Sequence, residues 1–107
     1  MRQVNKAEYT NKNGEFFHPD IPKDFDYWRM QGWGHDNNVV VKSCLMESNC
    51  QDEDLLHAVF EKGSTDISKW KPAMPEGFTL LAKFHDEDGN GPYAYFGKKM
   101  EDETYQS

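Results

Sequence analysis

The sequence has few aliphatic residues, few cysteines and no long apolar run. Hydrophobic residues make up 36% of its 107 positions, and the mean hydropathy is −0.94. No apolar stretch approaches membrane-spanning length, and the first ten residues lack the apolar centre of a signal peptide. These absences predict a cytoplasmic protein in which Cys44 and Cys50 are reduced thiols. The two cysteines also lack the short spacing that is typical of structural zinc sites.

The motifs of common enzyme classes are also absent. The sequence has no G-x-S-x-G nucleophile turn, no H-E-x-x-H zinc helix and no glycine-rich phosphate loop. A thiol enzyme centred on Cys50 is an alternative, but the three acidic residues that follow would oppose formation of its thiolate. The sequence therefore predicts a protein that is not an enzyme.

Aromatic residues provide much of the material for a hydrophobic core. They make up 14% of the sequence, with three Trp, five Tyr and seven Phe. Burial of such large rings removes much apolar surface from water and can offset the conformational entropy of so polar a chain. The chain is long enough for one modest core. We therefore expect a single globular domain over residues 1–98, followed by a flexible acidic tail over residues 99–107.

The charge of the chain is acidic and unevenly distributed. Its 19 Asp and Glu against 12 Lys and Arg give a net charge of −7 at pH 7. Residues 72–107 carry seven acidic and three basic side chains, a net charge of −4. Phosphate binding usually needs a basic surface, so direct binding of nucleic acid is not expected. An acidic surface suits a basic protein or a cation, or serves only to keep the protein soluble.

A hairpin near the C-terminus is the clearest structural pattern. Apolar and more polar residues alternate over residues 78–85, as in a strand with one buried face. The apolar positions are Phe78, Leu80, Ala82 and Phe84. An acidic loop and an aromatic return strand over residues 92–98 follow, so the two strands should pair.

The rest of the chain shows shorter elements. In order, we expect an edge strand over residues 2–10, a turn at 11–14, a short strand at 15–17, a helix between Pro22 and Gly32, a loop over 34–38, a central strand from Val39 to Met46 and a helix from Gln51 to Lys62. Together these elements predict an α+β fold: a mainly antiparallel sheet of four to five strands with two short helices packed on it.

Four aromatic residues lie within nine positions around the first expected helix. They are Phe25, Tyr27, Trp28 and Trp33. A chain with few aliphatic residues needs its rings inside, so we expect this cluster to be mostly core. The alternative is a surface for a partner protein, because Trp and Tyr often anchor interfaces. In that case Trp28 and Trp33 would be contact residues.

The segment Asp86-Glu87-Asp88-Gly89-Asn90-Gly91 matches the first half of an EF-hand calcium loop. Oxygens of Asp86, Asp88 and Asn90 would converge on the cation, and glycine permits the sharp turn. The twelfth position is Gly97 rather than a bidentate glutamate, and strands rather than helices are expected to flank the loop. An EF-hand is therefore excluded. A calcium site in a hairpin loop and a turn without a ligand both stay open.

Residues 67–99, ISKWKPAMPEGFTLLAKFHDEDGNGPYAYFGKK, resemble segments of small uncharacterised phage and prophage proteins of enterobacteria. The shared features are the Trp-x-Pro and Pro-x-Gly steps and the acidic loop that ends in glycine. The resemblance implies an accessory protein of a mobile element, many of which bind and alter a host protein. It assigns no role to individual residues.

We expect a small acidic binding protein that contacts a host protein and inhibits it. One version is an inhibitor of a nucleic-acid-binding or defence protein, with carboxylates in the place of phosphates. The expected partner-binding residues are Asp52, Glu53, Asp54, Asp86, Glu87, Asp88, Trp28 and Trp33. The alternative is a calcium-binding module that uses the loop from Asp86 to Asn90, and no other cofactor is expected.

Overall fold

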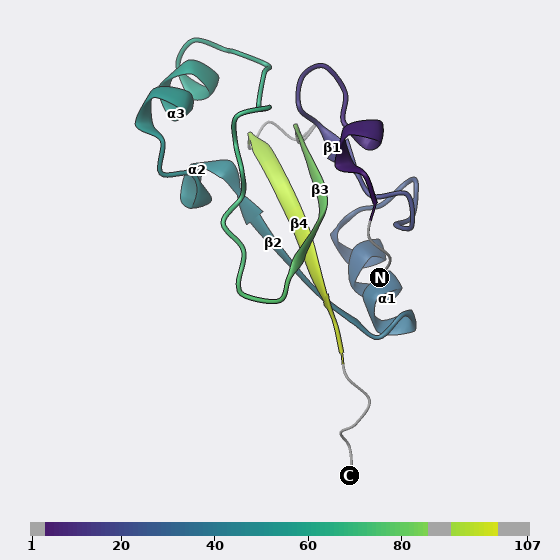
Figure 1. Cartoon of the computed structure of the whole chain (residues 1–107). Helices are drawn as coiled ribbons and strands as arrows, with labels where there is room; N and C mark the ends of the chain where they lie inside the picture. The colour runs from purple at the N-terminus through teal and green to yellow at the C-terminus, as the bar shows by residue number, and fades with distance from the viewer. Residues whose placement is uncertain (1–3, 86–90, 101–107) are drawn as a thin grey trace.

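A four-stranded antiparallel sheet forms the centre of the protein (Figure 1). The computed structural model describes residues 4–85 and 91–100. The strands lie in the order β1-β3-β4-β2, and each neighbouring pair is antiparallel. Their bounds are Phe16–Phe17 (β1), Val39–Leu45 (β2), Thr79–His85 (β3) and Pro92–Lys99 (β4). The α+β class and the antiparallel sheet are thus confirmed.

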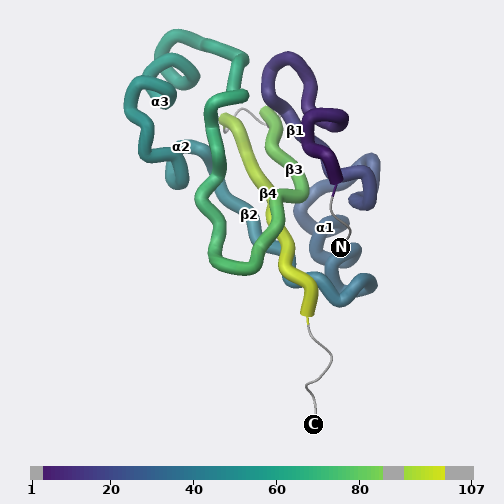
Figure 2. Tube along the Cα trace, viewed as in Figure 1, coloured from purple at the N-terminus to yellow at the C-terminus, as the bar shows by residue number. Residues whose placement is uncertain are grey.

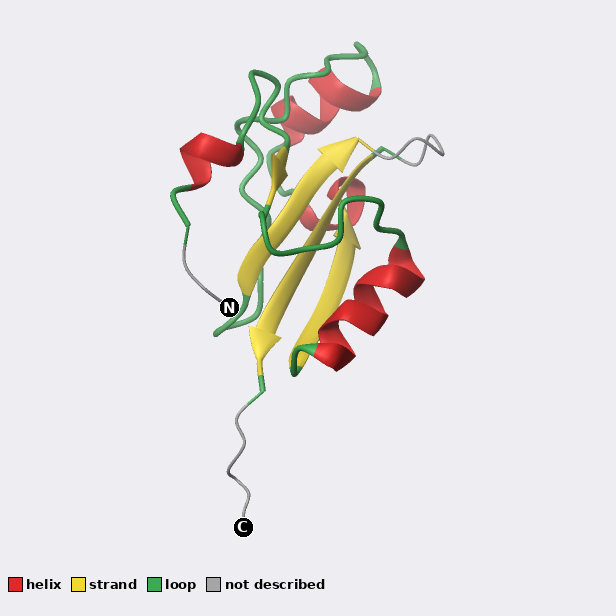
Figure 3. Ribbon diagram, turned by 90° about the vertical axis from the view of Figure 1, so that its right-hand side faces the viewer, coloured by secondary structure: helices red, strands yellow, loops and turns green. Residues whose placement is uncertain are grey.

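Helices lie on both sides of this sheet (Figure 3). The helix α1 (Tyr27–Asp36) packs on one face, whereas α2 (Met46–Asn49) and α3 (Glu53–Phe60) pack on the other. A short 3-10 helix, η1 (Lys6–Tyr9), precedes β1. Among residues 4–85 and 91–100, no helix has both the length and the apolar character needed to span a bilayer.

Each face of the sheet has a hydrophobic core. The α3-side core consists of Phe16, Met46, Val59, Ile67, Trp70, Leu80, Ala94 and Phe96. The α1-side core consists of Ile21, Met30, Val39, Val41, Leu81, Ala82 and Tyr95. Residues 63–78 form a long segment without helix or strand that covers part of the α3-side core (Figure 2). The segment itself contributes Ile67 and Trp70 to this core.

The strand β3 does not keep the strict alternation that its sequence shows. Its register with β4 shifts between Leu80 and Ala82, so Leu81 is an extra residue. Leu80 packs in the α3-side core, whereas Leu81 and Ala82 both pack in the α1-side core. The expectation of one apolar face over residues 78–85 is therefore wrong, because the bulge exchanges the two faces halfway along the strand.

The helix expected over residues 22–32 begins and ends later, at Tyr27 and Asp36. A carboxylate oxygen of Asp26 accepts a hydrogen bond from the N–H of Arg29 at 2.7 Å, which caps the first turn. The helix continues through Gly34, where a Cβ would lie 2.6 Å from a carbonyl oxygen of β2. This glycine allows α1 and β2 to approach closely rather than ending the helix. The expected loop after the helix is correspondingly shorter.

Three other expectations differ from the structure. Residues 6–9 form η1 rather than an edge strand, because the Asn5 side chain accepts a hydrogen bond from the N–H of Ala7 at 3.1 Å. The strand β2 lies at the edge of the sheet, not at its centre. The strand β4 runs through Lys99, so the sheet includes the first residue of the expected tail. Residues 101–107 lie outside the described part of the chain.

Two polar side chains, Lys83 of β3 and Asn49 of α2, bind the irregular segment 63–78 through hydrogen bonds. Lys83 is buried, and its Nζ donates to two backbone carbonyl oxygens of the segment at 2.7 and 3.1 Å. Asn49 accepts hydrogen bonds from the indole N–H of Trp70 at 3.2 Å and from the N–H of Ala73 at 2.9 Å. Its amide also donates to the carbonyl of Ala73 at 2.9 Å. These bonds satisfy backbone groups that secondary structure would otherwise pair.

Glu15 joins the turn before β1 to the end of β3. Its carboxylate accepts hydrogen bonds from the N–H of His85 at 3.0 Å and from the side-chain amide of Asn11 at 2.9 Å. Desolvation is the largest influence and raises the pKa of Glu15, but these bonds and the nearby His85 ring together lower that pKa below its ordinary value of 4.5. Folding therefore favours the ionised form of Glu15.

Candidate functional site: an acidic groove between α2 and α3

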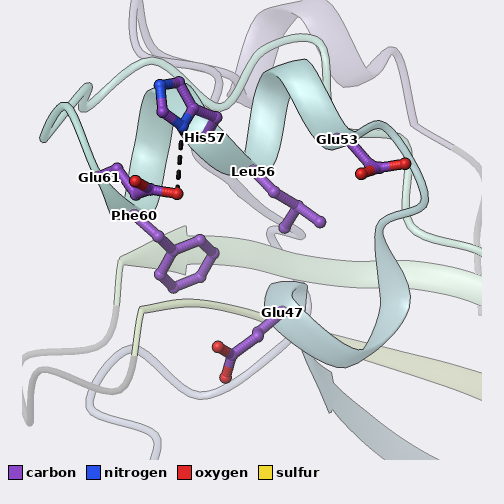
Figure 4. A pocket seen from close by; sticks show the side chains of 6 residues that line it. All are labelled: Glu47, Glu53, Leu56, His57, Phe60 and Glu61. Atoms are coloured by element: carbon purple, nitrogen blue, oxygen red, sulfur yellow. Dashed lines mark ion pairs between the residues drawn. The ribbon is translucent and has the colours of Figure 1, made fainter.

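An open groove lies between α2 and α3 (Figure 4). Its volume is about 360 Å³, and its lining side chains are Glu47, Glu53, Leu56, His57, Phe60 and Glu61. Leu56 and Phe60 point from α3 towards α2, and Glu47 lies across from them (Figure 4). The groove thus combines an apolar wall with carboxylates from two elements, and no lysine or arginine is among the described residues that line it.

The sequence of α3 places its lining residues on one side of the helix. The Asp52 carboxylate caps the helix by accepting a hydrogen bond from the N–H of Leu55 at 3.2 Å. Leu56 and Phe60 are four residues apart and therefore neighbours on the helix surface. The polar lining residues follow the same spacing and are Glu53, His57 and Glu61. One face of the helix accordingly carries an apolar row beside a mostly acidic row.

The acidic rim of this groove is exposed to solvent. The Nδ1 atom of His57 lies 3.1 Å from a carboxylate oxygen of Glu61, and both side chains are more than half exposed. Glu47 and Glu53 are exposed as well. A single exposed carboxylate attracts a cation only weakly, but several that surround one groove act on the same ligand. The geometry therefore suits a positively charged group that also has apolar surface.

This donor set differs from that of a metal centre. Within residues 4–85 and 91–100, no group of three or more His, Cys, Asp and Glu side chains is placed to hold a metal ion. The expected calcium ligands Asp86, Asp88 and Asn90 lie outside the described residues.

One of the three acidic residues expected as contacts at the start of α3 lines the groove. Glu53 does so, whereas Asp52 serves as the helix cap and Asp54 is exposed outside the groove. The other expected acidic contacts, Asp86, Glu87 and Asp88, lie outside the described part of the chain. The structure instead brings Glu53 together with Glu47 and Glu61.

The aromatic cluster around α1 is divided between core and surface. Phe25 and Trp33 pack against the α1-side core, but Trp28 is 79% exposed and Tyr27 is 46% exposed. The rings of Tyr27 and Trp28 meet edge to face, with 5.1 Å between centroids. The expectation of a mostly buried cluster is therefore wrong for these two residues, because α1 packs on the sheet through Met30, Trp33 and Gly34 instead. The helix α1, which carries both residues, lies on the opposite face of the sheet from α2 and α3 (Figure 1).

Glu47, His57 and Glu61 were not among the residues that the sequence predicted as partner contacts. The spacing of four residues that links His57 and Glu61 to Glu53 was a usable signal, because it places all three beside the apolar row of an expected helix. Glu47 gave no such signal. It belongs to α2, a single turn that the sequence did not predict, and only the fold brings it opposite α3.

Comparisons with protein families, curated proteins and solved structures found no match to this chain. A function for the protein therefore has to be argued from the chemistry of its own surface.

Proposed function

We propose that the protein is a non-enzymatic binding protein whose acidic groove holds a basic side chain of a partner protein. The observation that carries this proposal is that Glu47, Glu53 and Glu61 surround the apolar surface of Leu56 and Phe60. Lysine and arginine have the matching construction, an apolar stem that ends in a cation. The stem would lie on the apolar wall while the cation meets the carboxylates.

The openness of the groove favours binding over catalysis. Acid–base catalysis is most effective where water is excluded and the environment tunes the catalytic group. Here His57 and the three carboxylates lie at a rim that solvent reaches. Binding of an exposed basic residue needs no such enclosure, because rim charges act mainly on the rate and the specificity of association.

A more specific version of this function rests on the resemblance of residues 67–99 to phage and prophage accessory proteins. In that version the partner is a protein of the host cytoplasm. The groove binds a basic residue that this partner otherwise uses to contact nucleic acid. The net charge of −7 supports this version, since an acidic surface attracts the basic surface of a nucleic-acid-binding protein. The result would be inhibition of the host protein.

An NMR titration with a small cationic peptide tests the proposed binding mode. The probe is the tripeptide Gly-Arg-Gly capped at both ends, and the control is the same peptide with citrulline, which keeps the shape of arginine without its charge. We expect saturable changes in the amide signals of α2 and α3 with the arginine peptide and a weaker response to citrulline. Added salt should weaken the arginine response, because the contacts lie at an exposed rim.

Matched variants separate the groove from the general charge of the protein. Glu47→Gln with Glu53→Gln should weaken binding about fivefold, if each exposed ion pair contributes about 0.5 kcal/mol. Asp24→Asn with Asp36→Asn removes the same charge from exposed positions beside α1 and should leave the affinity nearly unchanged. Equal weakening by both pairs, or no saturable response to arginine, would contradict the proposal.

A further inference from the structure

A second pocket lies between the N-terminal segment and the start of β3. Its volume is about 280 Å³, and much of its wall is apolar. The apolar lining comes from Val4, Phe16, Met74, Phe78 and Leu80. Phe16 and Leu80 are themselves members of the α3-side core, so the pocket extends to the hydrophobic interior. An apolar group that enters it would therefore leave water on several sides.

The described lining of this pocket contains one lysine, Lys6, and an Asp20 carboxylate oxygen lies 3.9 Å from Nδ1 of the lining residue His18. Its polar side chains are Lys6, His18 and Thr79, and the described lining contains no carboxylate. His18 is buried, and its Nδ1 accepts a hydrogen bond from the N–H of Asp20 at 3.1 Å. The pocket thus combines an apolar wall with the ammonium of Lys6.

Lys83 places a second cation beside this pocket. It lies opposite Phe16 in the register between β1 and β3, and its Nζ is held by backbone carbonyl oxygens. Burial is the main cause that lowers the pKa of Lys83, and repulsion by Lys6 lowers it further. The carboxylate of Asp66 raises the pKa of Lys83. Asp66 is exposed, and its carboxylate accepts a hydrogen bond from the N–H of Ser68. An anion at Lys6 would offset the repulsion between the two lysines.

We propose that this pocket binds a small amphipathic carboxylate. The apolar tail would lie among Phe16, Phe78 and Leu80, and the carboxylate would meet the ammonium of Lys6. Pockets for drug-sized ligands start at about 300 Å³, so a ligand of this pocket has to be small, of the size of a medium-chain fatty acid. The inference is independent of the acidic groove, which has other lining residues and attracts the opposite charge.

Octanoate is the probe for this site. We expect saturable changes in the NMR signals of Thr79, Leu80 and the methyl group of Met74, and a rise in the thermal midpoint that follows ligand concentration. Three related molecules measure the separate contributions of the charge and the tail to binding. The compound 1-octanol lacks the charge, octylammonium reverses it, and butanoate has a shorter tail. Butanoate should bind at least about tenfold more weakly than octanoate, because four methylenes leave the apolar pocket.

Variants of exposed lysines test the contribution of the charge. Lys6→Gln should weaken octanoate binding about fivefold, the upper range for an exposed ion pair, and should bring it close to 1-octanol binding. Lys12→Gln makes the same change at an exposed lysine outside the lining and should have little effect. Absence of saturable changes, equal effects of the two variants, or binding of octylammonium as tight as that of octanoate would each overturn the proposal.

Discussion

Replacement of Lys83 by methionine should loosen the irregular segment 63–78 from the sheet. The Nζ atom of Lys83 donates to the carbonyl oxygens of Ile67 at 3.1 Å and Trp70 at 2.7 Å. Methionine is unbranched and apolar, so it fills much of the same space without either hydrogen bond. The Ile67 carbonyl keeps a bond from the N–H of Trp70 at 3.0 Å. The main loss in the variant therefore falls on the carbonyl of Trp70.

The expected loss of stability follows from opposing contributions. A hydrogen bond to a charged group contributes about 1.5–3 kcal/mol, and a buried carbonyl that loses its partner costs about 1–3 kcal/mol. The variant also removes the cost of burying an ammonium, which is the largest influence on the pKa of Lys83. We expect a net loss of about 2 kcal/mol in the free energy of unfolding at neutral pH. For a domain of this size, the thermal midpoint should fall by about 8–16 °C.

The pH dependence of stability isolates the role of the Lys83 charge. Burial lowers the pKa of this residue below its ordinary value of 10.5, so the unfolded chain binds the proton more readily between the folded-state pKa and 10.5. The stability of the wild-type protein relative to Lys83→Met should therefore rise with pH through that interval. Above it, the neutral amine can still donate its hydrogen bonds, while the cost of burying the charge is gone.

Urea unfolding of both proteins, from neutral pH to 10.5, measures this difference. Lys62→Met, at an exposed lysine that directly precedes the segment, is the control and should show no such pH-dependent gap. The reasoning would be refuted if Lys83→Met were as stable as the wild type at neutral pH. It would also be refuted if the difference in free energy of unfolding between the two proteins became smaller as pH rises.

Two further substitutions test the other polar contacts that support the fold. Asn49→Ala removes the bonds to Trp70 and Ala73 and should lower the free energy of unfolding by about 2 kcal/mol, which urea unfolding followed by tryptophan fluorescence can measure. Glu15→Gln should be less stable than the wild type above pH 4.5, because folding lowers the pKa of Glu15 and favours its ionised form. The difference should disappear as pH falls through the folded-state pKa, and thermal melting across the acid range checks this; a constant difference would contradict it.

The parts of the fold that follow from local signals could be predicted from the sequence. The turn before β1, the hairpin of β3 and β4, and α3 with its acidic first turn all appear at or near their expected positions. The strand β2 was recognised as a strand but misplaced within the sheet. Val39 and Val41 are buried under α1 whereas Val40 is 38% exposed, so valine content alone does not distinguish a covered edge strand from a central one.

The remaining features depend on contacts between distant parts of the chain. The bulge at Leu81 depends on how β3 pairs with β4, and its sequence shows only an uninterrupted alternation. The exposure of Trp28 depends on which face of α1 packs on the sheet, and that face carries Met30, Trp33 and Gly34. The acidic groove needs Glu47 from a separate helical turn. Periodicity describes one element at a time and cannot supply these relations.

Asn49 lies between the two proposed binding sites in the chain of contacts, because it follows Glu47 in α2 and binds the irregular segment 63–78. Asn49 holds Ala73, while the neighbouring Met74 lines the carboxylate pocket, and Glu47, two residues before Asn49, lines the acidic groove. Damage at Asn49 should therefore weaken the binding of both octanoate and the arginine peptide. Lys6→Gln should affect only octanoate, and Glu47→Gln with Glu53→Gln should affect only the arginine peptide. This pattern distinguishes residues that contact a ligand from residues that stabilise the fold. A purely structural defect would weaken the binding of both probes, whatever their charge.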